Sequence, residues 1–165
     1  MTARPILFLD VDGVLIRYGG DETVPDSASV ARSGPETDDE RHLRRIDPTV
    51  GSRLLALGCE LVWATGWEDR ANEVIAPLAG LPTLPVLNWD LTGLGPLSLH
   101  WKTTPIVDFA SGRTFVWLDD EVRTRDQDWV AVAHPGPALV HRVDPHLGLT
   151  DADLARVAAW LSSVD

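Results

Sequence analysis

The chain has 165 residues, of which 44% are hydrophobic, and a net charge of −11. This length fits a single domain over residues 1–165, and the negative charge argues against a protein that holds nucleic acid or an anionic membrane on a broad basic surface. Cys59 is the only cysteine, which excludes a disulfide within the chain, and no apolar run approaches the roughly 18 residues of a membrane-spanning helix. We expect a soluble, cytoplasmic protein.

Apolar runs that stop at polar residues predict buried parallel strands. The first run, residues 6–9, stops at Asp10. Further runs cover residues 60–64, 114–118 and 138–143, with a shorter candidate at 84–87. Segments with helical character cover residues 48–57, 68–78, 104–110 and 151–161. The alternation indicates an α/β fold class: a doubly wound, Rossmann-like, mostly parallel sheet with helices on both faces.

The last of these segments has the clearest helix signals. Thr150 can cap the first turn together with Asp153, which follows three residues later. Leu154, Val157 and Leu161 then share one face of the helix. We therefore expect this helix to begin directly after Thr150.

Residues 19–45 form a polar stretch that is rich in glycine, proline, serine and acids and has no apolar periodicity. They predict a long loop or flap inserted into the domain. Two interpretations stay open: a solvated excursion, or a flap that folds over the site and contacts substrate through its basic end. The basic end contains Arg41, Arg44 and Arg45.

Two acids follow the first predicted strand, where ligands bind in open α/β sheets. Asp10 and Asp12 are separated by one residue, and Gly13 then lets the chain turn away. An ionised carboxylate can attack phosphorus and divide the reaction into two easier steps through an aspartyl-phosphate. We expect Asp10 to be the nucleophile and Asp12 to protonate the leaving oxygen and then deprotonate the attacking water.

Polar residues near the other strand ends suit the same chemistry. Thr65 and Gly66 offer a hydroxyl and a backbone amide to phosphate oxygens, and Lys102 offers a positive charge. Asp119 and Asp120 follow a later strand and add two carboxylates.

Four carboxylates at one site would repel one another without a cation, and oxygen ligands select Mg²⁺. The direct ligands that we expect are Asp10, Asp119 and the backbone carbonyl of Asp12. Asp120 is expected to bind the ion directly or through a water molecule. The cation would also shield the anionic phosphate from its anionic nucleophile.

With these residues in place, the sequence resembles the haloacid dehalogenase-like superfamily of phosphatases from residue 5 to residue 125. The resemblance rests on motifs in the family's order: FLDVDGV with Asp10 and Asp12, LVWATG with Thr65, HWKTTP with Lys102, and VWLDDE with Asp119 and Asp120. The segments VWLDDE and RVDPHLGLT are also similar to small bacterial members associated with RNA repair. This similarity implies a compact core with a rudimentary cap and does not fix a substrate.

Two comparisons with the superfamily pattern bear on the reaction. Val14 stands where many of its phosphatases have Thr, and Val is also found there in phosphomutase-type members. Mutases of this type usually carry a substantial cap, and neither residues 19–45 nor 67–101 are long enough for one, which favours hydrolysis. Members that act on carbon–halogen bonds normally lack the acid/base at Asp12, which argues against dehalogenation. The prediction is a magnesium-dependent phosphomonoester hydrolase.

Alternatives of other classes stay open: a non-catalytic module that binds a phosphorylated ligand, a phosphotransferase or phosphomutase, and a domain that works within a nucleic-acid repair assembly. The expected partner is a phosphorylated small molecule or an exposed phosphate terminus. Trp67 and Trp101 either pack beside the pocket or stack on a planar group of the substrate. Arg17 and Tyr18, just beyond the first loop, are further candidates for substrate contact.

Overall fold

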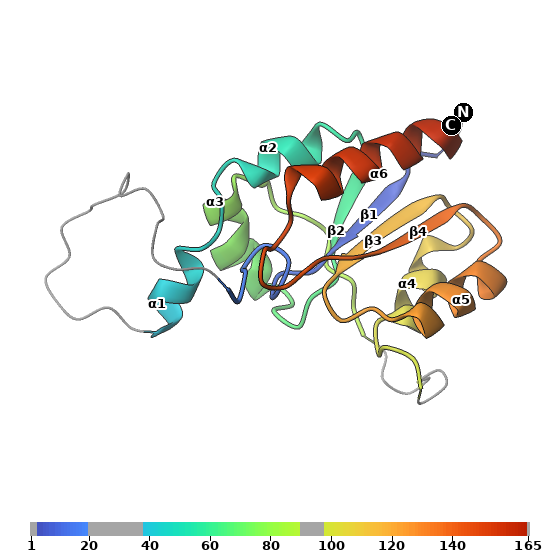
Figure 1. Cartoon of the computed structure of the whole chain (residues 1–165), viewed down its shortest axis with the longest axis horizontal. Helices are drawn as coiled ribbons and strands as arrows, with labels where there is room; N and C mark the ends of the chain where they lie inside the picture. The colour runs from blue at the N-terminus through green and yellow to red at the C-terminus, as the bar shows by residue number, and fades with distance from the viewer. Residues whose placement is uncertain (1–2, 20–37, 90–97, 165) are drawn as a thin grey trace, which may run out of the picture.

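In the computed structural model, which describes residues 3–19, 38–89 and 98–164, four parallel strands form one open sheet. The strands are β1 (Ile6–Leu9), β2 (Glu60–Trp63), β3 (Phe115–Asp119) and β4 (Ala138–Arg142). Their order in the sheet is β2-β1-β3-β4, and every neighbouring pair is parallel (Figure 1). The predicted α/β class with a parallel sheet is confirmed, and β1 and β3 are its central strands.

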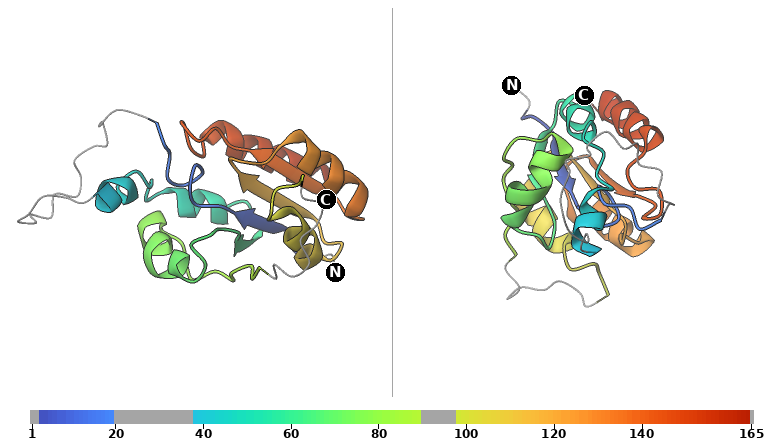
Figure 2. Two further views of the ribbon diagram at one scale, coloured as in Figure 1. Left: turned by 90° about the horizontal axis from the view of Figure 1, so that it is seen from below. Right: turned by 90° about the vertical axis from the view of Figure 1, so that its left-hand side faces the viewer.

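Helices cover both faces of this sheet (Figure 2). The helices of the described ranges are α1 (Asp38–Leu43), α2 (Val50–Leu55), the π-helix η1 (Ala71–Ile75), α3 (Ala76–Ala79), α4 (Thr103–Ala110), α5 (Thr124–Ala133) and α6 (Asp151–Val164), and all except α1 contribute buried residues to the two faces. No helix in the three described ranges is both long enough and apolar enough to cross a membrane.

Alternation along β1 divides the core into two apolar clusters, because successive side chains of a strand point to opposite faces. Leu7 and Leu9 belong to the cluster that contains residues of α2, η1, α3 and α6. Ile6 and Phe8 belong to the cluster that contains residues of α4 and α5. All four residues of β1 are fully buried. The strand therefore lies between two helical layers, and its end is the natural place for a buried polar site.

The expected strand at residues 84–87 is reduced to a single bridge between Trp63 and Val86. The backbone amide of Trp63 donates to the carbonyl of Pro85 at 2.8 Å, and the amide of Leu87 donates to the carbonyl of Trp63 at 2.8 Å. Pro85 has no N–H group with which to extend the ladder. The segment runs along the sheet edge without becoming a regular strand.

The expected helix cap at Thr150 is present. The carboxylate of Asp153 accepts hydrogen bonds from the Thr150 amide at 2.8 Å and the Thr150 hydroxyl at 2.6 Å, and the Asp153 amide donates back to the hydroxyl at 3.3 Å. Helix α5, in contrast, was not predicted. Its buried positions are Asp126 and Val130, so it lacks the apolar stripe from which a helix is usually inferred.

The predicted loop or flap at residues 19–45 lies mainly outside the described residues, which resume at position 38. The part that is described contains helix α1, which the polar composition did not indicate. Beyond this helix, the Arg45 guanidinium donates to the backbone carbonyls of Arg17 at 3.1 Å and Tyr18 at 3.3 Å. The C-terminal end of the segment is therefore attached to the loop that follows β1.

Candidate active site

The two central strands of the sheet end beside each other and carry the first and last acids of the predicted site. Asp10 follows β1 directly, and its amide donates to the carbonyl of Leu118 in β3 at 3.2 Å. Asp119 is the last residue of β3, and Asp120 follows it. The carboxylates of Asp10, Asp119 and Asp120 each have an oxygen within 4.8 Å of the others, and all three residues are buried. Asp10 is 109 positions from Asp119 in the chain, and the two acids meet because their strands pair.

Lys102 is the only lysine in the sequence, and it lies inside this cluster. Its Nζ is 2.9 Å from Oδ2 of Asp10 and 2.7 Å from Oδ2 of Asp119, and the residue is only 3% exposed. Burial alone would lower the pKa of Lys102, but the charges of the two carboxylates and their hydrogen bonds raise it above its ordinary value. The ammonium group therefore stays protonated and bridges the two acids.

One lysine does not balance the negative charge of the cluster. Burial raises the pKa of Asp10 to about 7; Lys102 and a 2.8 Å hydrogen bond from the Val11 amide oppose this effect, and the charge of Asp119 adds to it. Burial and the charge of Asp119 also raise the pKa of Asp120. When all three carboxylates are ionised, they and the one ammonium group carry a formal charge of −2. A divalent cation would neutralise this charge.

Gly13 has a backbone requirement that explains its position in the loop. Its φ is +72°, and a Cβ atom built there would lie 2.4 Å from both Cγ and Oδ2 of Asp120. Its amide also donates to the carbonyl of Ile16 at 2.8 Å, which closes the turn after β1. The missing side chain lets the loop pass directly against the Asp120 carboxylate.

Asp12 is partly exposed and does not belong to the group of three buried carboxylates. Its Oδ2 accepts a hydrogen bond from the indole Nε1 of Trp67 at 3.0 Å. The predicted acid/base is thus held from the β2 side of the site. The sequence predicted that Trp67 packs beside the pocket or stacks on the substrate, and it did not predict this hydrogen bond to Asp12. The Asp12 carbonyl stays a predicted metal ligand.

Thr65 and Gly66 occupy the turn after β2, as predicted. Thr65 is fully buried, and its hydroxyl accepts the Trp67 amide at 3.3 Å. Gly66 is exposed, and nothing lies within 4 Å of the place where its Cβ would be. A hollow of about 510 Å³ lies here, lined by Asp12, Gly66, Trp67, Glu68, Asp69 and Arg70. Gly66 and Asp12 therefore border the same space.

Asp126 and His100 support the site and were not predicted. Asp126 is fully buried, and its carboxylate accepts the His100 amide at 2.7 Å, the Thr103 hydroxyl at 2.9 Å and the Arg123 amide at 2.9 Å. His100 Nδ1 in turn accepts the Lys102 amide at 3.2 Å. These bonds attach the segment that carries Lys102 to the start of α5. An acid three residues into a helix is a capping signal, and it was the one sequence feature that could have revealed Asp126.

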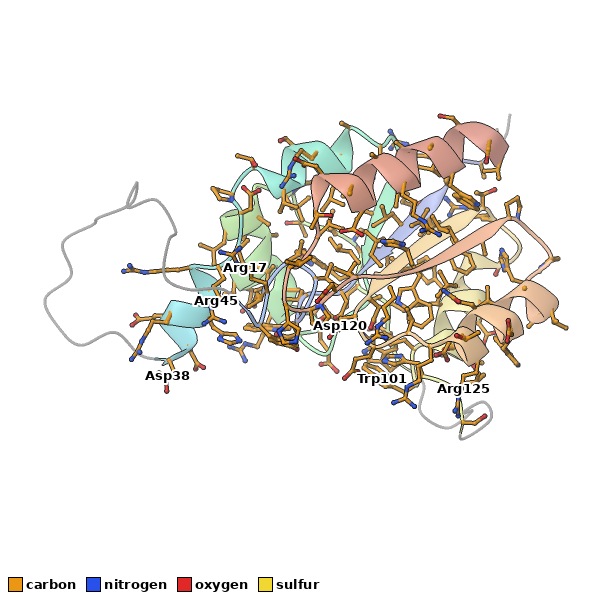
Figure 3. The ribbon with its side chains drawn as sticks, in the orientation of Figure 1. Arg17, Asp38, Arg45, Trp101, Asp120 and Arg125 are labelled. Atoms are coloured by element: carbon orange, nitrogen blue, oxygen red, sulfur yellow. The ribbon has the colours of Figure 1, made fainter. Side chains whose placement is uncertain are left out.

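The loop after β1 brings Tyr18 near the acids. Partial burial, followed by the charges of Asp120 and Asp12, raises the pKa of Tyr18 to about 12. Figure 3 shows Arg17 and Arg45 on this side of the molecule, and Trp101 and Arg125 on the other side of Asp120. The surroundings of the carboxylate cluster therefore contain both aromatic and cationic side chains.

Comparison of the chain with family models, with curated proteins and with solved structures gives no match. The superfamily resemblance therefore stays a prediction from its motifs. The chemistry of the described residues is the basis for any functional conclusion.

Proposed function

We propose that this chain is a magnesium-dependent phosphomonoester hydrolase of the haloacid dehalogenase-like superfamily. The observation that carries the proposal is the group of three buried carboxylates around one buried lysine, whose formal charge is −2 when all three acids are ionised. Structural ion pairs tend towards balance, because an unpaired buried charge is costly. A buried excess of negative charge at the carboxyl ends of parallel strands is instead typical of a cation site that serves a reaction.

The donor set fits magnesium. Asp10, Asp119 and Asp120 offer hard carboxylate oxygens, and no histidine or cysteine belongs to this cluster within the described ranges. Each carboxylate oxygen has two lone pairs, so Asp119 can bind a cation while it accepts hydrogen bonds from Lys102 and from the Glu121 amide. When bound, the cation supplies neutralisation between the nucleophile and the phosphate and fixes the position of one phosphate oxygen.

The proposed reaction uses Asp10 and Asp12 in two steps. A carboxylate oxygen of Asp10 forms a bond to phosphorus while the bond to the leaving oxygen breaks, and Asp12 gives its proton to that oxygen. Asp12, now ionised, then takes a proton from a water molecule, which attacks the phosphorus of the phospho-aspartate. The products are free phosphate, the alcohol and regenerated Asp10 with Asp12 protonated.

The remaining residues hold the reacting groups. Lys102 and the Val11 amide bond opposite oxygens of Asp10, which fixes the rotation of the carboxylate. The amide of exposed Gly66 and the hydroxyl of Thr65 are the donors for the phosphate on the β2 side. The Trp67 indole positions the Asp12 carboxylate.

The test is hydrolysis of an aryl phosphate by purified protein with and without Mg²⁺. Asp10→Asn is expected to abolish Mg²⁺-dependent phosphate release while the circular dichroism spectrum is retained. The matched control is Asp128→Asn, an exposed acid on α5 away from the site, which is expected to leave the rate unchanged. A wild-type protein that binds Mg²⁺ and a phosphorylated ligand without turnover would instead support the binding-module alternative. Absence of both Mg²⁺ binding and hydrolysis across a panel of phosphate esters would rule the proposal out.

A further inference from the structure

A second hollow adjoins the carboxylate cluster at Asp120, and Asp12 is not among its lining residues. It measures about 540 Å³ and is lined by Ser98, Leu99, His100, Trp101, Asp120, Glu121, Arg123, Arg125, Asp126, Arg142 and Pro145. Asp120 belongs both to this hollow, which we call the arginine cleft, and to the carboxylate cluster. A ligand that reacts at Asp10 can therefore extend into the cleft.

Three arginines line the arginine cleft in a chain with a net charge of −11. Arg125 donates to the carbonyl of Ser98 at 3.0 Å, and Arg142 donates through Nε to the carbonyl of Asp120 at 3.0 Å. Within the described ranges, none of Arg123, Arg125 and Arg142 has a carboxylate within 4.0 Å. Arg53 and Arg113, by comparison, do form ion pairs with acids.

The acids that line the cleft are directed to other partners. Asp126 is fully buried, and its carboxylate accepts the three hydrogen bonds described above. Glu121 lies 3.3 Å from His100 Nε2. Asp120 is one of the acids of the proposed cation site. The cleft therefore offers positive charge and guanidinium N–H groups that the described acids do not use.

We infer that the arginine cleft binds a second anionic group of the substrate, so that the preferred substrate is a phosphate ester whose leaving group carries another phosphate or a carboxylate. This inference rests on the proposed function and names its substrate class. Guanidinium groups bind phosphate and carboxylate through two parallel N–H bonds, which suits an anion held at a fixed distance from the reacting phosphorus. Trp101, 40% exposed at the same wall, gives the linking part of the substrate an apolar surface.

The test compares adenosine 3′,5′-bisphosphate with adenosine 5′-monophosphate as substrates of the Mg²⁺-loaded protein, with phosphate release as the readout. Whichever phosphate of the bisphosphate reacts, the other is the second anion. The wild type is expected to show a kcat/KM for the bisphosphate at least about tenfold above that for the monophosphate. The double variant Arg123→Gln/Arg125→Gln is expected to lose most of this ratio. Arg156→Gln, an exposed arginine on α6 outside the cleft, is expected to keep it.

Equal ratios in the wild type and the double variant would overturn the inference. The proposed function can fail separately, if no phosphate ester, aryl phosphate included, is hydrolysed. In that case, titration calorimetry with the same bisphosphate tests whether the arginine cleft binds an anion. An affinity that is lost in the double variant and kept in Arg156→Gln supports the anion site. An affinity that is the same in the wild type and in both variants contradicts it. Both arginines are exposed, so the double variant is expected to fold. An unchanged circular dichroism spectrum would show that a lost affinity or a lost ratio is not caused by unfolding.

Discussion

At the scale of single residues, the site depends on a close approach between Gly13 and Asp120. Any side chain at position 13 meets the Asp120 carboxylate and must also adopt a φ of +72°. We expect Gly13→Ala to destabilise the fold by about 1–3 kcal/mol and to displace Asp120 from the cluster. Mg²⁺ affinity measured by calorimetry should fall together with the midpoint of urea denaturation. Gly58→Ala is a matched control, because Gly58 also has a positive φ of 73° but has nothing within 4 Å of its Cβ position; it should lose stability and keep the affinity.

A substitution at Lys102 can separate the contribution of its charge to stability from the contribution of its packing. Lys102→Met keeps an apolar stem of similar length but leaves Asp10 and Asp119 buried without their counter-charge. We expect a loss of about 3 kcal/mol in the free energy of unfolding without metal, since breaking a buried ion pair strands the remaining charge. Added Mg²⁺ should restore part of that loss. A variant as stable as the wild type in metal-free buffer would show that the lysine does not balance these acids.

At the scale of elements, helix α5 positions the segment that carries Lys102. The buried carboxylate of Asp126 accepts hydrogen bonds from His100, Thr103 and Arg123. Removal of this carboxylate would leave the three donors without a partner, which lowers the free energy of unfolding. Asp126→Ala is expected to cost about 2–4 kcal/mol of stability and to lower phosphate release. Asp128→Ala on the same helix, where the side chain is exposed, is the control and should change neither quantity appreciably. Equal effects at both positions would mean that the helix, and not the carboxylate, is responsible.

The elements also show what a sequence pattern can and cannot predict. Apolar runs predicted β1 at its observed bounds and β2, β3 and β4 within one or two residues, because a strand buried on both faces has a distinctive composition. Helix α5 was missed because one of its two buried positions is an aspartate. The bond between Trp67 and Asp12 was missed for a related reason: it joins loops that follow different strands, and local patterns carry no information about such a pair.

At the scale of the whole molecule, the site acids illustrate the same limit. The residue types at strand ends predicted that these acids would share one site, and strand pairing in the structure brings Asp10, Asp119 and Asp120 together. Burial depth was not readable from the sequence, and it is burial that raises the pKa of Asp10 to about 7. The charge imbalance at the centre of the proposal therefore emerges only from the folded chain.

This raised pKa connects the site to the stability of the whole protein. The folded chain without metal retains a proton on Asp10 at pH values where the unfolded chain, with a pKa of 3.8, has released it. Its contribution to stability is therefore complete below the unfolded pKa and is lost as the pH rises towards about 7. Bound Mg²⁺ displaces that proton, so its affinity should rise with pH until Asp10 is ionised.

The expected result is a Mg²⁺-induced increase in Tm that is larger at about pH 8 than at about pH 5.5, with affinity changing by up to about tenfold per pH unit below the Asp10 pKa. Thermal denaturation with and without Mg²⁺ across this range measures it. Asp10→Asn cannot release a proton at this position and should lose most of the pH dependence. A Mg²⁺ effect independent of pH in the wild type would place the ion elsewhere.

The most direct measurement of the central claim is the identity of the phosphorylated residue during turnover. Wild-type protein with Mg²⁺ and an aryl phosphate would be quenched in acid and treated with borohydride, which reduces a phosphorylated aspartate to homoserine, and the position would be found by mass spectrometry. Homoserine at position 10, absent from Asp10→Asn and from protein without substrate, is the predicted result. Phosphate release with no modification at position 10, or with modification at Asp12 or Asp119 instead, would contradict the assignment of Asp10 as the nucleophile.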